Sequence, residues 1–346
     1  MRAGVAAICL ALWACRLPDL IGGGGSGYHM ADTTYRVGTP LRSDVHAFDW
    51  APDGRTLYAA TWSSGLLALD LATDSARVLD DLGSATVEVV PGPSAHDIYY
   101  VRFWPSREVA TRRQLVRVSS APGSPVTLLV DSVPPDFCCL TVSGDGAWAA
   151  LYSAQTTIWN LGTGASSQVP DGMPVAFGTA GRLALLSTHD ACRVFALDAG
   201  TNATISQPWL ADPFCVRGGV RWIGDSLAGV GIFGRDLPTR GDTLYAAGGP
   251  GSLRAIYVLP FDDAVTSLTW SADGSKLAIW YDACGTLGFL LCATDSYKSL
   301  YVLDVASGVA QRIAGGRGVN GAASFSPDGR RIAYWFNSTL YVDAVP

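Results

Sequence analysis

The sequence is poor in charged residues, in histidine and in long apolar runs. Only 16% of its 346 residues are charged, and the net charge is −6. Such a chain lacks the basic stripe of a nucleic-acid surface, so we expect no nucleic-acid partner. It also lacks a run of about 18 or more apolar residues, so we expect no transmembrane helix. The four histidines stand at His29, His46, His96 and His189, without metal-ligand spacing, and we expect neither a metal nor a cofactor.

The motifs of common catalytic sites are missing as well. There is no Gly-x-Ser-x-Gly elbow, the turn that carries the serine of many hydrolases. The pattern Gly-x-Gly-x-x-Gly matches three times, beginning at Gly22, Gly229 and Gly316. None of these matches lies between a strand and a helix, as a dinucleotide site requires. The sequence therefore favours a protein that is not an enzyme and has no catalytic residues.

Glycine, proline and tryptophan are abundant, and they recur in a repeat. The stretch from Phe325 to Tyr334 reads as a strand, a tight turn and a second strand. In that turn Pro327 presets φ, Asp328 can bond the backbone two residues on, and Gly329 accepts the left-handed conformation. The same turn follows Trp50 (Ala51–Gly54) and Trp270 (Ser271–Gly274), with a fainter copy at Val142–Gly146. A unit that recurs about every 40–50 residues indicates a radial or solenoid array.

A second turn, which contains Asp or Asn, ends the third strand of several units. It occurs at Asp70, Asn160, Asp198 and Asp304, where a short polar side chain can cap the turn backbone. Aligned on both turns, the chain divides into about seven units, which start near residues 47, 87, 139, 175, 219, 266 and 322. We interpret Trp50, Trp222, Trp270 and Phe325, which share one repeat position, as packing residues between units.

The repeats predict an all-β fold, a seven-bladed β-propeller of four-stranded antiparallel blades. The last unit stops after its third strand, while Thr34–Gly38, upstream of the first unit, is similar to the outer strands. We therefore expect an N-terminal strand to complete the last blade and close the ring, which leaves only short strand edges.

The element strand–Ser-Pro-Asp-Gly–strand resembles the repeat of the TolB-like and WD40-like (PD40-type) propeller family. The resemblance covers nearly all of the chain after Ala31 and is carried best by Pro52–Gly54, Asp273–Gly274 and Ser326–Gly329. Some relatives carry an α/β domain before the repeats or a hydrolase domain after them. Neither is found here, so the resemblance implies a bare propeller.

The N-terminus predicts export. Met1 and Arg2 give a positive start, and Ala3–Ala14 is an apolar run of signal-peptide length. Leu12–Cys15 resembles the bacterial lipoprotein box, in which Cys15 would carry the lipid; the alternative is a signal peptide that is cut elsewhere. We expect a signal peptide over 1–15, a Gly-rich tether over 16–30 and a propeller domain over 31–346. The protein would then be periplasmic or cell-surface, held to a membrane by its lipid anchor only.

Six cysteines remain when Cys9 and Cys15 are set aside, and an even number in an exported chain favours disulfides. Cys284 and Cys292 flank an insertion whose ends a hairpin would bring together. Cys192 and Cys215 fall on the same face of adjacent units. We therefore expect bridges 284–292 and 192–215, which leave Cys138 and Cys139 as a vicinal pair or as separate thiols.

The extra length of the chain falls on one side of the predicted ring. The two kinds of short turn share one face. The other face carries the insertions and the long links between blades. The insertions are 103–113, 234–242 and 283–296, and the links are 131–137 and 208–218. Repeat proteins commonly confine insertions to the face that binds, although extra loop length can also be merely tolerated. Aromatic and Arg side chains dominate interfaces, so Trp104, Arg112, Arg113 and Trp209 are the candidate contacts.

Two functions fit these observations. The sequence favours a non-catalytic binding or assembly module that docks an envelope or membrane-associated protein partner. The alternative is a propeller enzyme, or a binder of a small ligand or carbohydrate, that uses the central channel. A basic run lies beside Phe103 and Trp104. It is either a patch that binds an anion or an acidic partner, or a solvated segment balanced by acids of neighbouring blades. The run comprises Arg102, Arg107, Arg112, Arg113 and Arg117.

Overall fold

The computed structural model describes residues 40–346, except 82–88, 95, 106–111, 188–193, 207–214, 224–225, 234–242, 248–253, 259–263, 284–296 and 318–319. Apart from a single 3-10 turn at Thr179–Gly181, the regular structure described is entirely β. No helix in these ranges is long and apolar enough to cross a membrane.

The described strands form seven antiparallel sheets of four strands, which we call blades and number along the chain. Blade one comprises β2 (Val45–Trp50), β3 (Thr56–Thr61), β4 (Gly65–Asp70) and β5 (Ser75–Asp80). Blade two comprises β6 (Val89–Pro91), β7 (Asp97–Trp104), β8 (Arg112–Ser119) and β9 (Thr127–Val133). Blade three comprises β10 (Phe137–Val142), β11 (Trp148–Ser153), β12 (Thr156–Asn160) and β13 (Ser166–Val169). Blade four comprises β14 (Met173–Phe177), β15 (Arg182–Leu186), β16 (Val194–Asp198) and β17 (Thr204–Ser206).

The remaining blades follow the same order from the first strand outward, with one exception. Blade five comprises β18 (Cys215–Ile223), β19 (Ser226–Phe233), β20 (Thr243–Ala247) and β21 (Arg254–Val258). Blade six comprises β22 (Ala264–Trp270), β23 (Lys276–Ala283), β24 (Tyr297–Asp304) and β25 (Val309–Arg317). Blade seven comprises β26 (Asn320–Phe325), β27 (Arg331–Phe336), β28 (Thr339–Ala344) and, as its fourth strand, β1 (Pro40–Ser43).

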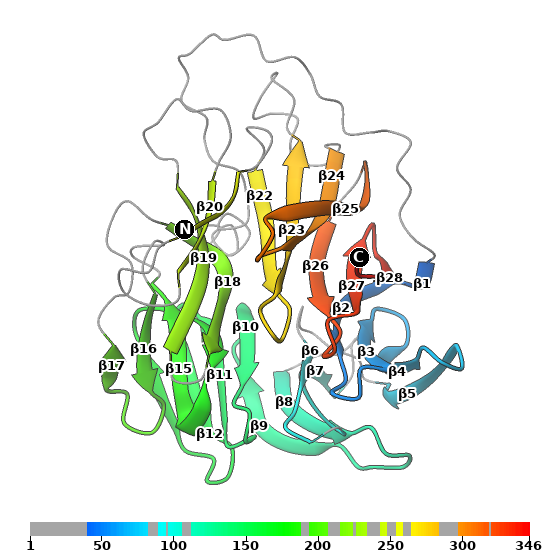
Figure 1. Ribbon diagram of the computed structural model, residues 1–346. Helices are drawn as coiled ribbons and strands as arrows, with labels where there is room; N and C mark the ends of the chain where they lie inside the picture. Colours follow the sequence, from blue (N-terminus) through cyan, green and yellow to red (C-terminus); the bar gives the residue numbers. More distant parts are fainter. Residues whose placement is uncertain are drawn as a thin grey trace, which may run out of the picture.

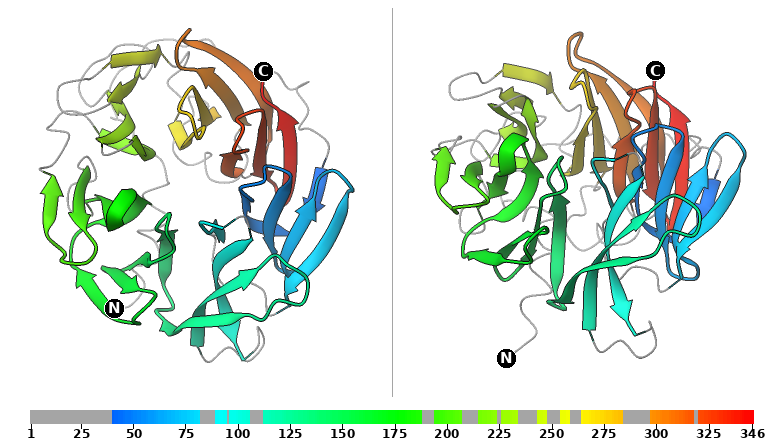
Figure 2. Two further views of the ribbon diagram at one scale, coloured as in Figure 1. Left: turned by 60° about the horizontal axis from the view of Figure 1, so that its bottom comes forward. Right: turned by 90° about the horizontal axis from the view of Figure 1, so that it is seen from below.

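The blades stand around a common axis (Figures 1 and 2). The first strand of each blade contacts the first strand of the next, in the cycle β2, β6, β10, β14, β18, β22, β26 and back to β2. These inner strands begin within four residues of the unit starts that the turns predicted. The all-β fold and its four-stranded antiparallel blades are therefore confirmed.

The N-terminal strand β1 closes the ring, as predicted. It pairs with β28 in antiparallel register, with Arg42 opposite Leu340 and Ser43 opposite Thr339 (blue beside red in Figure 1). The stretch expected in this place, Thr34–Gly38, lies outside the described residues. An N-terminal strand thus completes the last blade, as expected, and in the described residues it comprises Pro40–Ser43.

The repeated turns are held by the bonds that their sequences predict. Ser326 Oγ donates to Asp328 Oδ1 (2.5 Å) and accepts from Arg331 N (2.9 Å). The same pair of bonds recurs around Ser143 and around Ser271. In blade one, where Ala51 replaces this serine, Asp53 Oδ1 accepts from Thr56 N instead (2.9 Å). These carboxylates are turn caps, as interpreted from the sequence.

The core lies between the faces of consecutive blades. Tyr58 of blade one and Tyr100 of blade two are fully buried in one such layer. Between blades six and seven, Trp280 packs edge-on against Tyr334, with ring centroids 6.0 Å apart. Because each layer draws side chains from two sheets, removing a residue from it loosens both blades.

Candidate functional site

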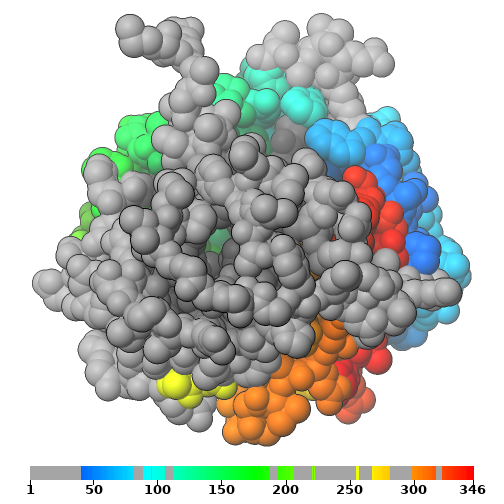
Figure 3. All heavy atoms as spheres, turned by 90° about the horizontal axis from the view of Figure 1, so that it is seen from above, coloured from blue at the N-terminus to red at the C-terminus, as the bar shows by residue number. Residues whose placement is uncertain are grey.

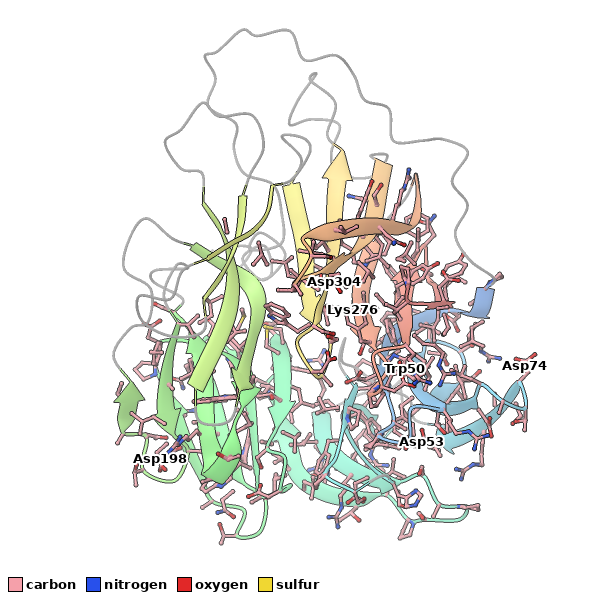
Figure 4. All side chains as sticks on the ribbon, in the orientation of Figure 1. Trp50, Asp53, Asp74, Asp198, Lys276 and Asp304 are labelled. Atoms are coloured by element: carbon pink, nitrogen blue, oxygen red, sulfur yellow. The ribbon has the colours of Figure 1, made fainter. Side chains whose placement is uncertain are left out.

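The two faces of the ring differ in the connections they carry. The face that we call the turn face holds the short turns within blades; Figure 4 shows Asp53 and Asp198 at this lower side. The opposite face, which we call the loop face, holds the connections between second and third strands and the links between blades. Figure 3 looks onto the loop face, where blade seven, in red, adjoins blade one, in blue.

On the loop face of blade one, Trp62 forms an exposed aromatic platform. Its side chain is 58% exposed, although it belongs to a tight connection between β3 and β4. The ring stacks on His46, with centroids 4.2 Å apart and planes 29° from parallel. A large apolar side chain on a rigid support offers contact area without much loss of conformational entropy on binding.

Hydrogen bonds from β1 and its neighbours fix this connection. Trp62 N donates to Asp44 O (3.2 Å), and Ser63 N donates to Asp44 Oδ2 (2.7 Å). Arg42 Nη2 donates to Ser64 Oγ (3.3 Å), and Ser64 N donates to Thr61 Oγ1 (3.0 Å). Trp62 was not among the contacts predicted from the sequence, although a large aromatic residue within the polar turn Thr61–Gly65 was a signal for it.

The loop-face end of the β7–β8 hairpin brings three predicted contact residues together. Trp104 lies opposite Arg112, and Phe103 lies opposite Arg113. Arg113 Cζ is 5.6 Å from the centroid of the Phe103 ring. Arg112 Nη1 forms an ion pair with Asp131, and both side chains are nearly half exposed. The fourth predicted residue, Trp209, lies outside the described residues, as does Arg107.

Arg102, in the same basic run, is neutralised by an acid of the neighbouring blade. Its Nη1 lies 3.5 Å from Asp80 Oδ2, and its guanidinium stacks over Trp104 at 5.0 Å. Tyr100 Oη also donates to Asp80, and burial, followed by the charge of Asp80, raises the pKa of the Tyr100 phenol above its usual range. Arg102 thus has an acidic partner in the neighbouring blade, as the balanced alternative predicted, whereas Arg112 pairs with an acid of its own blade. Neither is an unoccupied anion site.

On the inner strand β2, the notable titratable group is Asp49. Its Oδ1 accepts from Ser324 Oγ and from Trp50 N, both at 2.8 Å. Burial raises the pKa of Asp49 to about 6, although both hydrogen bonds lower it. Ser324 belongs to β26, so this carboxyl bridges blades one and seven. In the described ranges, no three His, Cys, Asp or Glu side chains are grouped as a metal site would need.

Two of the aromatic residues at the shared repeat position tie their blade to the one before it. Trp50 Nε1 donates to Ser324 O (2.9 Å), and Trp222 Nε1 donates to Ala176 O (3.1 Å). Ser324 and Ala176 lie on the inner strands of the preceding blades, each one residue before the aromatic residue of that strand. Trp50 and Phe325 are buried. These contacts confirm packing, rather than a ligand cage, for the described rings.

Gly178 offers a test of this packing, because the Trp222 ring lies directly over it. A Cβ at Gly178 would lie 2.6 Å from the nearest atom of that ring. The φ of Gly178 is −100°, which any residue can adopt, so a penalty would come from the clash alone. We expect Gly178→Ala to lower the free energy of unfolding by about 1–3 kcal/mol in urea titrations.

Gly144→Ala is the matched control for that substitution. No atom lies within 4 Å of a Cβ built at Gly144, and this residue occupies the turn position that Pro52 and Ala272 hold in other blades. We expect its unfolding midpoint to equal that of the wild type. Equal midpoints for both variants would mean that Trp222 moves aside without cost.

The predicted modification and disulfide sites are not reached by the described residues. Cys15, Cys192, Cys284 and Cys292 lie outside them, and Cys215 begins β18 with its side chain not described. Bridges 284–292 and 192–215 therefore stay predictions. The cysteines whose side chains are described are the vicinal pair Cys138 and Cys139.

Comparisons with known proteins place the fold and no more. No protein-family model matches the chain, and no curated protein matches it by sequence. Among solved structures, an oligogalacturonate lyase in complex with manganese is 18% identical, with a TM-score of 0.60, over 91% of this chain and 90% of that one. An oligogalacturonate lyase from Vibrio parahaemolyticus is 15% identical, with a TM-score of 0.58, over 91% and 92%.

A third similar structure is a β-propeller domain. The Cps50 (Swd1) β-propeller domain of Myceliophteria thermophila is 12% identical, with a TM-score of 0.60, over 90% of this chain and 100% of that one. These neighbours of one fold therefore include oligogalacturonate lyases and the Cps50 (Swd1) β-propeller domain. The class established for this chain is the β-propeller.

Proposed function

We propose that this chain is a non-catalytic, PD40-type propeller of seven blades that docks a protein partner through its loop face. The observation that carries the proposal is Trp62, a rigidly held and largely exposed aromatic residue on that face. Trp, Tyr and Arg supply most of the energy of protein interfaces. The same face presents Trp104, Arg112 and Arg113 at the end of the neighbouring blade.

The partner belongs to the bacterial cell envelope in this proposal. The apolar N-terminal run and the box that ends at Cys15 would export the chain and anchor it by lipid, and the Gly-rich segment would act as a tether. The propeller would then be held near a membrane, where an envelope or membrane-associated protein can reach its loop face.

Capture of partners from detergent-solubilised membranes tests the proposal. We expect Trp62→Ala to reduce capture by roughly 30-fold, the effect of losing a hot spot of about 2 kcal/mol. Its melting temperature should stay close to that of the wild type, because the side chain is mostly exposed. The pair Trp104→Ala/Arg113→Ala should also reduce capture, with a lower melting temperature because Trp104 stacks against Arg102.

Val309→Ala serves as the control, since Val309 is 54% exposed on the outer strand β25. It removes exposed apolar surface away from the proposed contact and should leave capture unchanged. The proposal fails if Trp62→Ala captures as much partner as the wild type, or if all three variants lose capture equally.

A small ligand or carbohydrate in the central channel is the second candidate function. It is favoured by Asp49, because a carboxyl with a pKa of about 6 can exchange protons near neutral pH. One neighbour of the same fold is an oligogalacturonate lyase in complex with manganese. Asp49, however, accepts a hydrogen bond from Ser324 across the seam between blades and another from the adjacent Trp50 N, which accounts for its position structurally. Saccharide binding that Asp49→Asn abolishes and Trp62→Ala spares would favour the channel.

A further inference from the structure

Cys138 and Cys139 are neighbours in sequence whose sulfur atoms lie 2.8 Å apart. Both belong to β10, the inner strand of blade three, and both are half-buried. In a regular strand, consecutive side chains point to opposite faces, which keeps adjacent sulfurs well apart. The backbone here must therefore depart from the regular strand.

That departure is a bulge centred on Cys139. Opposite β11, Cys138 pairs with Tyr152 and Thr141 pairs with Ala150, so two residues of β10 face one of β11. Cys139 has φ of +63°, in the left-handed region that costs a residue with a Cβ about 1–2 kcal/mol. In the described part of the chain, it is the only non-glycine inside a strand with positive φ; the others lie in turns or connections.

Bulges of inner strands occur in other blades without this conformation. The register shifts between Val45 and Ala47 in β2, between Pro174 and Ala176 in β14, and between Val265 and Ser267 in β22. None of the residues at those shifts has a positive φ. Among these four bulged strands, the left-handed residue occurs in the one that carries the two thiols, and it brings both sulfurs to one side.

We propose that Cys138 and Cys139 form a vicinal dithiol–disulfide couple, a redox-active site on the inner strand of blade three. A disulfide bond is about 2.05 Å long, so the sulfurs need to approach by less than about 1 Å. The ring so formed runs through both side chains and the peptide bond between them. This inference does not depend on the proposed docking function.

Closure proceeds by exchange with a low-molecular-weight or protein disulfide. The thiolate of one cysteine attacks the oxidant, which releases one thiolate and leaves a mixed disulfide on the protein. The second cysteine thiolate attacks that protein sulfur and releases the other thiolate. Two electrons pass from the pair to the oxidant, whose disulfide is reduced to two thiols that take up the two protons. The reduced pair presents two adjacent sulfurs, the arrangement that a trivalent arsenical bridges.

Trypsin isolates this pair from every other cysteine. Between Arg117 and Arg182 the chain has neither Lys nor Arg, and Cys138 and Cys139 are the only cysteines in that interval. The native, mildly reduced full chain is incubated with oxidised glutathione, its thiols are blocked with N-ethylmaleimide, and the denatured chain is digested. From the oxidised chain, we expect peptide 118–182 to carry no maleimide and to be lighter than the reduced peptide by two hydrogens. If the chain is reduced before the blocking step, the same peptide should carry two maleimides.

Two controls make the result decisive. Phenylarsine oxide should bind the reduced native chain at this pair and protect both cysteines from maleimide. Cys139→Ser should abolish that protection. With oxidised glutathione, the same variant should keep Cys138 as a glutathione mixed disulfide. Oxidation in urea should close the ring at least about tenfold more slowly, because the unfolded chain lacks the bulge that aligns the sulfurs. Two maleimides or two glutathiones on the oxidised native peptide, or equal rates in urea, would overturn the inference.

Discussion

Replacing Trp50 by alanine is expected to lower the free energy of unfolding by about 3–5 kcal/mol, measured by urea titration. Trp50 is 3% exposed and lies in the layer where blade seven meets blade one. Its indole donates to Ser324 O, and Arg331 Cζ stacks 5.1 Å from its ring centroid. The substitution thus removes apolar contact, a hydrogen bond and a cation–π contact at the point where the ring closes.

Trp50→Phe separates these contributions. Phenylalanine already serves at the same repeat position as Phe325, so it should retain most of the packing. It lacks the N–H that bonds Ser324 O, and we expect a loss of only about 1–2 kcal/mol. A Trp50→Ala variant that unfolds at the wild-type midpoint would show that the seam between blades seven and one contributes little to stability.

The second large effect concerns Asp49 and pH. Its pKa is raised from 3.8 to about 6 in the folded chain, so the folded state holds a proton at pH values where the unfolded state has lost it. The free energy of unfolding should therefore fall as pH rises from about 4 to about 6, and then level off. Asp49→Asn should abolish this fall and be more stable above pH 6 by on the order of 2–3 kcal/mol.

The turn carboxylates provide an internal comparison, because their pKa values are lowered rather than raised and their effect on stability therefore has the opposite dependence on pH. Hydrogen bonds from Ser271 and Ser275 lower the pKa of Asp273 to about 2. Its contribution is present above the unfolded pKa and is lost as pH falls from about 4 to about 2. In urea titrations, the free energy of unfolding should therefore rise between about pH 2 and about pH 4, through Asp273, and fall between about pH 4 and about pH 6, through Asp49. If Asp49→Asn follows the wild-type profile between pH 4 and 6, Asp49 does not titrate as described.

The blades were predictable because their turns require particular residues. The Ser-x-Asp-Gly turn needs a carboxylate to cap it and a glycine with positive φ, here Gly274 (+71°) and Gly329 (+67°), so each copy marks a strand pair. The closing strand was predictable because the last unit lacks an outer strand. Pro40–Ser43 was not included in it, because these four residues carry no alternating pattern, whereas Thr34–Gly38 resembles the outer strands.

The candidate site was predictable only in part. The sequence placed Trp104, Arg112 and Arg113 in one insertion, and the β7–β8 pairing indeed brings them together. The pairing of Arg102 with Asp80 depends on how blades one and two pack. Whether Trp62 is covered or exposed also depends on that packing, because a tryptophan in a short turn can do either. The bulge at Cys139 arises from tertiary register, which neither cysteine encodes by itself.

Because β1 pairs with β28, blade seven can be completed only at the end of synthesis of the chain. Residues 40–43 leave the ribosome early, yet their partner, residues 339–344, is made only after all the other blades. Contacts so distant in sequence form late, since long loops must close first. A nascent chain can fold its early blades one after another, while the edge of blade seven awaits a segment that has been present from the start. Premature docking of β1 on another exposed edge is the misfolding hazard that this arrangement creates.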